Sequence, residues 1–157
     1  MRETGAITLG EALNNRADLQ TRIAQLTTRL GDNIKVQEGD EPALSPNSLK
    51  KELFTAIDAL GVLIERINKT NLATDFDNDK KLSEALIERE NLMKKRQVVQ
   101  QMIDRASENS NRYSMSEIKM VSVVDVKDLI KQRDHLSRRI RELDISIQQL
   151  NWNTDLI

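Results

Sequence analysis

The sequence predicts a mainly all-α fold: four long antiparallel helices arranged as two repeated helical hairpins in a single domain over residues 1–157. Two observations predict it. Apolar residues recur every three or four positions over four segments, which is the spacing of helices packed against other helices. The composition agrees, because aromatic residues are only 3% and charged residues 31% of the 157 residues, with five glycines and two prolines. With so few aromatic residues the core must consist mainly of aliphatic side chains, which suits helix-on-helix packing.

The first helix is expected over residues 9–30. Apolar residues repeat there every seven positions with a second set between them, and Arg16 interrupts this heptad seam. Thr8 followed by Glu11 has the spacing of a capping box. Gly31 fits the end of the helix, because glycine tolerates the backbone conformation that stops it.

The second helix is expected over residues 46–68. Ser45 is a good N-cap, and Pro46 suits the first helical position. The predicted seam of this helix consists of Leu53, Ile57, Leu60, Ile64 and Ile67.

The third and fourth helices are expected over residues 82–106 and 126–150, with Asp125 as the N-cap of the fourth. The stretch LSEALIERENL at 82–92 matches LGEALNNRADL at 9–19 in six of eleven positions. This similarity predicts an internal repeat in which residues 8–74 and 81–156 each form one hairpin. Short connections would make neighbouring helices antiparallel.

Long loops join the two helices within each hairpin, and long loops tend to carry function or assembly. Each contains a short β-prone segment, at 34–36 and 118–120, and the two segments are candidates to pair as strands. Tyr113 fits a partner-binding loop, since aromatic residues are enriched at interfaces. The predicted interface residues are Ile34, Val36, Tyr113, Ile118 and Met120.

Arg16 and Arg89 occupy equivalent seam positions in the two halves of the repeat. A buried charge without a partner would cost several kcal/mol, so each arginine needs a carboxylate, carbonyl groups or water. One interpretation is an anion site at the polar end of the bundle. A second, which is favoured, is a structural layer that fixes the register of the helices, and a third is that the arginine side chains extend along the seam to keep their charges in water. The residues of the candidate anion site are Arg16, Arg89, Asn68, Thr70 and Asn71.

No metal site, cofactor or catalytic residue is expected. The stretch DFDND at 75–79 resembles the start of a calcium loop, but Lys80 stands where that loop needs glycine and Leu86 where it needs glutamate. A polar turn is therefore favoured. His135 is the only histidine and falls on the outward face of its helix.

The charge and cysteine content narrow the partners and the compartment. A formal net charge of −1 does not suggest a nucleic-acid binder. The absence of cysteine favours a cytoplasmic location. No apolar run approaches the roughly 18 residues that cross a membrane, and no signal peptide is recognisable. These features predict a soluble cytoplasmic protein without a membrane partner.

Five stretches together resemble one family of small bacterial proteins. They are L.EAL..R.DLQ.RI..L at 9–26, VQEGDEP at 36–42, ERINKTNLAT at 65–74, RYSMSEIKMV at 112–121 and RELD..IQ..NW at 141–152. In these motifs the chain is similar to the septicolysin-like family. The resemblance implies no catalytic residues, although the family name suggests a membrane-active cytolysin.

Three functions follow as hypotheses. The favoured one is a non-enzymatic helical scaffold that self-associates into a homo-oligomer, because heptad seams promote helix association. The alternative is an anion- or nucleotide-binding module, with or without enzymatic activity, that uses the Arg/Asn-rich end. A cytolysin ranks last, since the chain has no cysteine to activate and no membrane-length segment.

Overall fold

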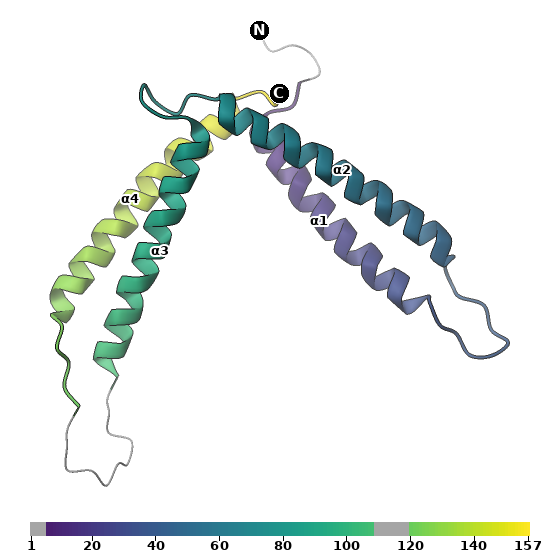
Figure 1. Cartoon of the computed structure of the whole chain (residues 1–157), viewed down its shortest axis with the longest axis horizontal. Coiled ribbons are helices and arrows are strands. Elements are labelled where there is room, and N and C mark those ends of the chain that lie inside the picture. The colour runs from purple at the N-terminus through teal and green to yellow at the C-terminus, as the bar shows by residue number, and fades with distance from the viewer. Residues whose placement is uncertain (1–5, 109–119) are drawn as a thin grey trace. The chain divides into compact units, whose positions relative to one another are not determined.

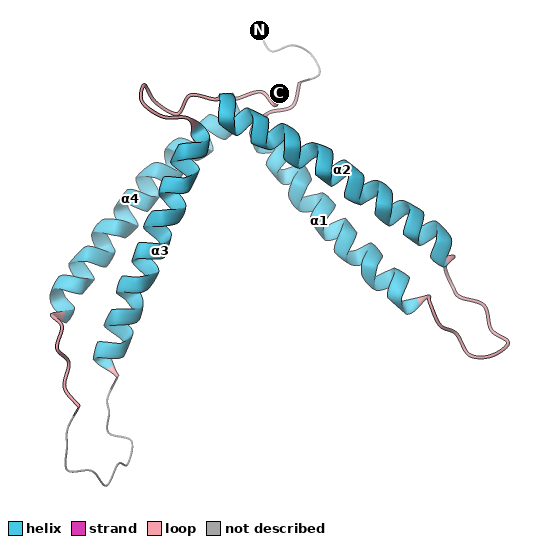
Figure 2. Ribbon diagram, viewed as in Figure 1, coloured by secondary structure: helices cyan, strands magenta, loops and turns pink. Residues whose placement is uncertain are grey.

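The structure is a computed structural model that describes residues 6–108 and 120–157. Its four helices confirm the predicted all-α class (Figures 1 and 2). They pair as two hairpins, α1 with α2 and α3 with α4. The helices are α1 (Leu9–Asp32), α2 (Pro46–Ala73), α3 (Leu82–Ser107) and α4 (Val126–Asn153).

The chain divides into two compact units. The first unit comprises Met1–Asp75 and Gln149–Ile157, and the second comprises Phe76–Gln148. Each hairpin therefore has its own unit, and α4 runs from the second unit into the first. The packing of both hairpins into one domain stays a prediction.

The ends of α1 are fixed by side chains. At its start the predicted capping box is confirmed, since the Glu11 N–H donates to Thr8 Oγ1 (3.1 Å) and the Thr8 N–H donates to Glu11 Oε2 (2.6 Å). Its end differs from the prediction. The helix continues past Gly31, and Asn33 closes it by donating from its side-chain amide to the Arg29 carbonyl (2.8 Å).

Helix α2 begins as predicted, with Ser45 Oγ accepting from the Ser48 N–H and Pro46 in the first turn. It continues to Ala73, five residues beyond the predicted end at Asn68. The extra residues include Thr70, which is completely buried and whose hydroxyl accepts from the Ile157 N–H (3.0 Å). The core of this hairpin consists of Leu26, Leu49, Leu53 and Ala56, with Ile23 and Leu30 packed against it.

The last residues of the chain pair with the start of α1. The Leu9 N–H donates to the Thr154 carbonyl (2.8 Å), and the Leu156 N–H donates to the Ile7 carbonyl (2.9 Å). Between them, Thr8 and Asp155 form an antiparallel bridge. This short pairing, here called the strap, fastens the end of the chain to the first unit.

Trp152 lies inside α4, because this helix continues to Asn153, beyond its predicted end at residue 150. Its ring rests against Gly10, where a Cβ atom would come within 2.8 Å of two ring carbons. Glycine at this position therefore allows the close approach of the indole ring.

The β-prone segments do not form strands where the structure describes them. Residues 34–36 are irregular. Of the segment 118–120, only Met120 lies within the described residues, and it is exposed.

In the second unit, α3 and α4 pack through Val99, Ile103 and Leu129, with Val126, Ile130 and Leu136 beside them. The predicted N-cap of α4, Asp125, is confirmed. Its Oδ1 accepts from the N–H groups of Lys127 (3.0 Å) and Asp128 (3.2 Å). No helix within the described residues is long and apolar enough to span a membrane.

Candidate functional site

The α1–α2 hairpin has two chemically different sides. Consecutive residues of a helix are turned by about 100°. In an antiparallel pair, the residues just after the packed positions lie on one side of both helices, and the residues just before them lie on the other. The two sides are therefore each built from both helices.

The side formed by the residues just before the packed positions carries charged and polar side chains, and is here called the polar side. A shallow groove on it is lined by Asn15, Asp18 and Arg22 of α1 and by Ala59, Val62 and Arg66 of α2. Arg22 Nη2 forms an ion pair across the hairpin with Glu52 Oε1 (2.6 Å). Arg66 Nε donates to the Ile157 oxygen (2.9 Å), so part of the polar side helps to hold the end of the chain.

The opposite side carries no charge along its central part, between residues 13 and 24 of α1 and between residues 54 and 64 of α2, and is here called the apolar side. It consists of Leu13, Ala17, Gln20 and Ala24 of α1 with Phe54, Ile57, Gly61 and Ile64 of α2. The exposed fractions are 57% for Phe54, 45% for Ile57 and 36% for Ile64. A row of exposed large apolar side chains is typical of an interaction surface.

The sequence pattern located this row wrongly. Ile57 and Ile64 were predicted on the seam, but the buried residues are Leu49, Leu53, Ala56 and Ile67. The buried stripe and the exposed stripe of α2 are offset by one residue, and the apolar periodicity alone does not tell them apart. The signal for the second stripe is the run of apolar residues immediately after the packed positions.

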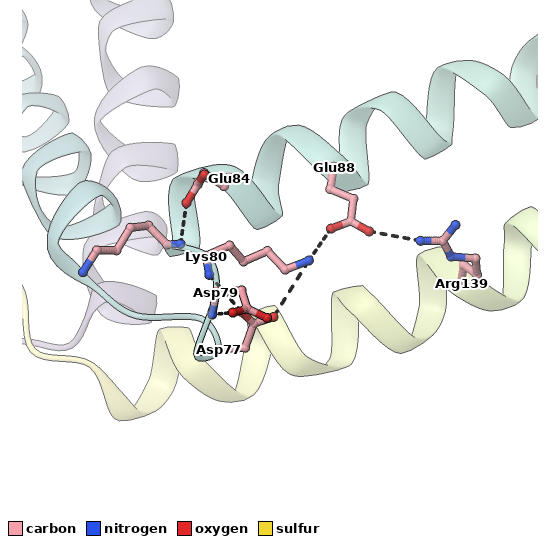
Figure 3. A network of polar contacts seen from close by, with 7 residues as sticks. Asp77, Asp79, Lys80, Glu84, Glu88 and Arg139 are labelled. Atoms are coloured by element: carbon pink, nitrogen blue, oxygen red, sulfur yellow. Dashed lines mark hydrogen bonds and ion pairs between the residues drawn. The ribbon is translucent and has the colours of Figure 1, made fainter.

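A network of charges closes the turn before α3 (Figure 3). Lys80 Nζ lies 2.6 Å from Glu88 Oε2, and Arg139 Nη2 of α4 lies 3.1 Å from Glu88 Oε1. Asp77 Oδ1 accepts from the N–H groups of Asp79 and Lys80, both at 2.9 Å. The stretch DFDND is thus a polar turn in which the Asp77 carboxylate binds backbone N–H groups of the residues that follow it.

The pKa of Lys80 is raised, mainly by its hydrogen bond to Glu88 and against the opposing effect of burial. A raised lysine pKa stabilises the fold below the unfolded value of about 10.4, and this stabilisation disappears as the pH rises through the folded pKa. We expect Lys80→Met to be less stable than the wild type at pH 8 and the difference to shrink towards pH 11, measured by urea unfolding.

Lys94→Met provides the control for this prediction. Lys94 pairs with Glu90 at 3.1 Å, but both side chains are about two-thirds exposed, at 69% and 66%. Such pairs contribute little to stability. If Lys80→Met and Lys94→Met lose equal stability at pH 8, the Lys80 network does not stabilise the turn.

The two arginines of the predicted anion site have different surroundings. Arg16 is half-buried on α1 in the first unit. Arg89 belongs to the second unit, and its Nη1 forms an ion pair with Asp144 Oδ1 of α4 (2.6 Å). The charge of Arg89 is thus met by a carboxylate, as the structural interpretation requires.

The other members of that site lie on the last turns of α2. Asn68 is exposed and Asn71 half-buried. Thr70 is fully buried, and its hydroxyl donates to the Arg66 carbonyl (2.8 Å) while accepting from the Ile157 N–H (3.0 Å). This hydroxyl therefore fastens the strap. Anion binding by these residues stays a prediction.

The predicted interface residues are exposed where they are described. The exposed fractions are 63% for Ile34, 47% for Val36 and 78% for Met120. Tyr113 and Ile118 lie outside the described residues. The role of these five residues as an interface stays a prediction.

Comparisons with known proteins identify the family of the chain and one similar solved structure. Residues 16–156 match a "Family of unknown function (DUF6847)". The crystal structure of a functionally unknown conserved protein from Corynebacterium diphtheriae is 39% identical, with a TM-score of 0.91 over 98% of this chain and 100% of that one. No curated protein matches the chain. The resemblance to the septicolysin-like family is therefore wrong, because the family model assigns the chain to a different family and neither match indicates a septicolysin-like protein.

Proposed function

Because the chain belongs to the DUF6847 family, whose function is unknown, we propose its function from the geometry: a non-enzymatic helical scaffold that self-associates through the apolar side of the α1–α2 hairpin. One observation carries this proposal. Phe54, Ile57 and Ile64 form a single row on α2 and are between one third and three fifths exposed. Burial of such side chains is the main driving force of protein association.

Helix α2 carries the surface of a helix that has two neighbours. One stripe packs against α1 through Leu49, Leu53 and Ala56. The second stripe starts one residue later and faces about 100° away. Helices of a four-helix bundle contact two neighbours at about this angle. A second hairpin would therefore complete the packing that α1 alone does not provide.

The size of the apolar side also suits a stable dimer. Helix α1 has 24 residues and is about 36 Å long at 1.5 Å per residue. Two helices about 10 Å apart present a side about 20 Å wide. The whole side has a footprint of roughly 700 Å² per copy, close to the roughly 800 Å² that each partner buries in a standard interface, and the apolar residues occupy about half of it as a core with a polar rim.

Sedimentation equilibrium at micromolar concentrations tests this proposal. We expect the wild type to dimerise and Phe54→Lys to weaken the dimer at least tenfold, because the lysine would bring an unpaired charge into an apolar interface. Circular dichroism should show unchanged helix content, since Phe54 is 57% exposed.

Val62→Lys is the matched control. Val62 is 60% exposed and also lies on α2, but it faces the polar side. This variant should dimerise as the wild type does. A monomeric wild type, or equal effects of the two substitutions, would contradict the proposal.

A further inference from the structure

The apolar side is built from two rows of unequal size. The row on α2 is bulky and consists of Phe54, Ile57 and Ile64, with Gly61 between them. The row on α1 is small at Ala17 and Ala24, both of which are exposed. One helix thus presents a ridge, and its neighbour presents gaps at Ala17 and Ala24 on either side of Gln20, here together called the groove.

The ridge and the groove have the same spacing along the hairpin. Ala17 and Ala24 are seven residues apart, as are Ile57 and Ile64. Leu26 belongs to the same buried cluster as Leu53 and Ala56, which fixes the approximate level of the antiparallel helices. By this register Ile57 lies approximately level with Ala24, and Ile64 approximately level with Ala17.

A symmetric dimer can stack two such sides in two ways. With the two-fold axis across the helices, ridge faces ridge and groove faces groove, which leaves gaps beside the alanines. With the axis along the helices, each ridge lies over the partner's groove at the same level. Protein interfaces approach the packing density of protein interiors, so the second arrangement is favoured.

Both arrangements make α2 antiparallel to the helix that it covers, so the helix dipoles do not distinguish between them. The rotation about an axis along the helices preserves their direction, so α2 lies on a partner α1 that runs the opposite way. Antiparallel neighbours place opposite ends of the helix dipoles together. Because the two rows carry no charge, ion pairs do not contribute to this orientation.

We propose that a second copy of the chain docks with the two-fold axis parallel to the helices, so that Ile57 packs over the partner's Ala24 and Ile64 over the partner's Ala17. This inference rests on the proposed self-association and specifies which element of the partner covers the ridge. Phe54 extends the same ridge towards the start of α2.

A size exchange tests the arrangement by sedimentation equilibrium. Ala24→Leu should weaken the dimer at least tenfold, because the leucine fills the groove that receives Ile57. The double variant Ala24→Leu/Ile57→Ala should recover affinity to within about threefold of the wild type, since the ridge and groove are exchanged. An unchanged affinity of Ala24→Leu, or no recovery in the double variant, overturns the arrangement.

Cysteine cross-linking gives a second, independent readout, because the chain contains no cysteine. Ala24→Cys mixed with Ile57→Cys should form a disulfide-linked dimer that neither variant forms alone. Efficient cross-linking of Gly61→Cys with itself would indicate ridge-to-ridge packing and overturn this inference while leaving self-association intact. A wild type that stays monomeric overturns both proposals and means that another occupant covers the apolar side.

Discussion

Replacing Leu156 by alanine is expected to lower the free energy of unfolding of the first unit by about 2–5 kcal/mol, the usual range for a buried leucine. The Leu156 side chain is only 7% exposed, and its N–H donates to the Ile7 carbonyl. Loss of this anchor should also loosen the strap. Hydrogen exchange should therefore accelerate at the Leu9 amide, which donates to the Thr154 carbonyl.

Ile157→Ala is the matched control for this prediction, because the neighbouring side chain is 58% exposed. Its cost should stay within about 0.5 kcal/mol, as for most exposed positions. Exchange in α3 should change little in either variant, since α3 belongs to the second unit. Equal losses of stability in Leu156→Ala and Ile157→Ala would show that the strap does not anchor the first unit.

Local signals predicted the starts of the helices correctly. The capping residues lie within three residues of the backbone groups that they cap. They are Thr8 with Glu11, Ser45 with Pro46, and Asp125. Such interactions depend on neighbouring residues alone, so the sequence displays them directly. The predicted helix ends were less accurate, since the last turn of α2 contains Thr70, whose buried hydroxyl is bonded to the distant Ile157.

Interactions between distant segments were not predictable in the same way. The strap joins residues 7–9 to residues 154–156, which no periodicity connects. Arg89 could be recognised as a seam charge, but its partner Asp144 depends on the register of α3 against α4. The apolar side was hidden for a similar reason, because Ile57 and Ile64 fit two stripes that differ by one residue.

Gly10→Ala is expected to destabilise the first unit by about 1–3 kcal/mol, the usual cost of an added methyl group in a filled site. The new Cβ would lie 2.8 Å from two ring carbons of Trp152, so the ring must move away. Trp152 is the only tryptophan and is 47% exposed, so its fluorescence reports this movement directly. We expect emission at longer wavelength, together with a lower midpoint of urea unfolding.

Gly31→Ala separates this contact from the general effect of removing a glycine from a helix. A Cβ at Gly31 meets nothing within 4 Å. Alanine should therefore raise stability there, by up to about 1 kcal/mol, through its higher helix propensity. In a Trp152→Ala background, Gly10→Ala should lower stability much less than it does in the wild type, because there is no indole ring to displace. A Gly10→Ala protein with wild-type emission and stability would show that the indole ring does not pack on α1 in solution.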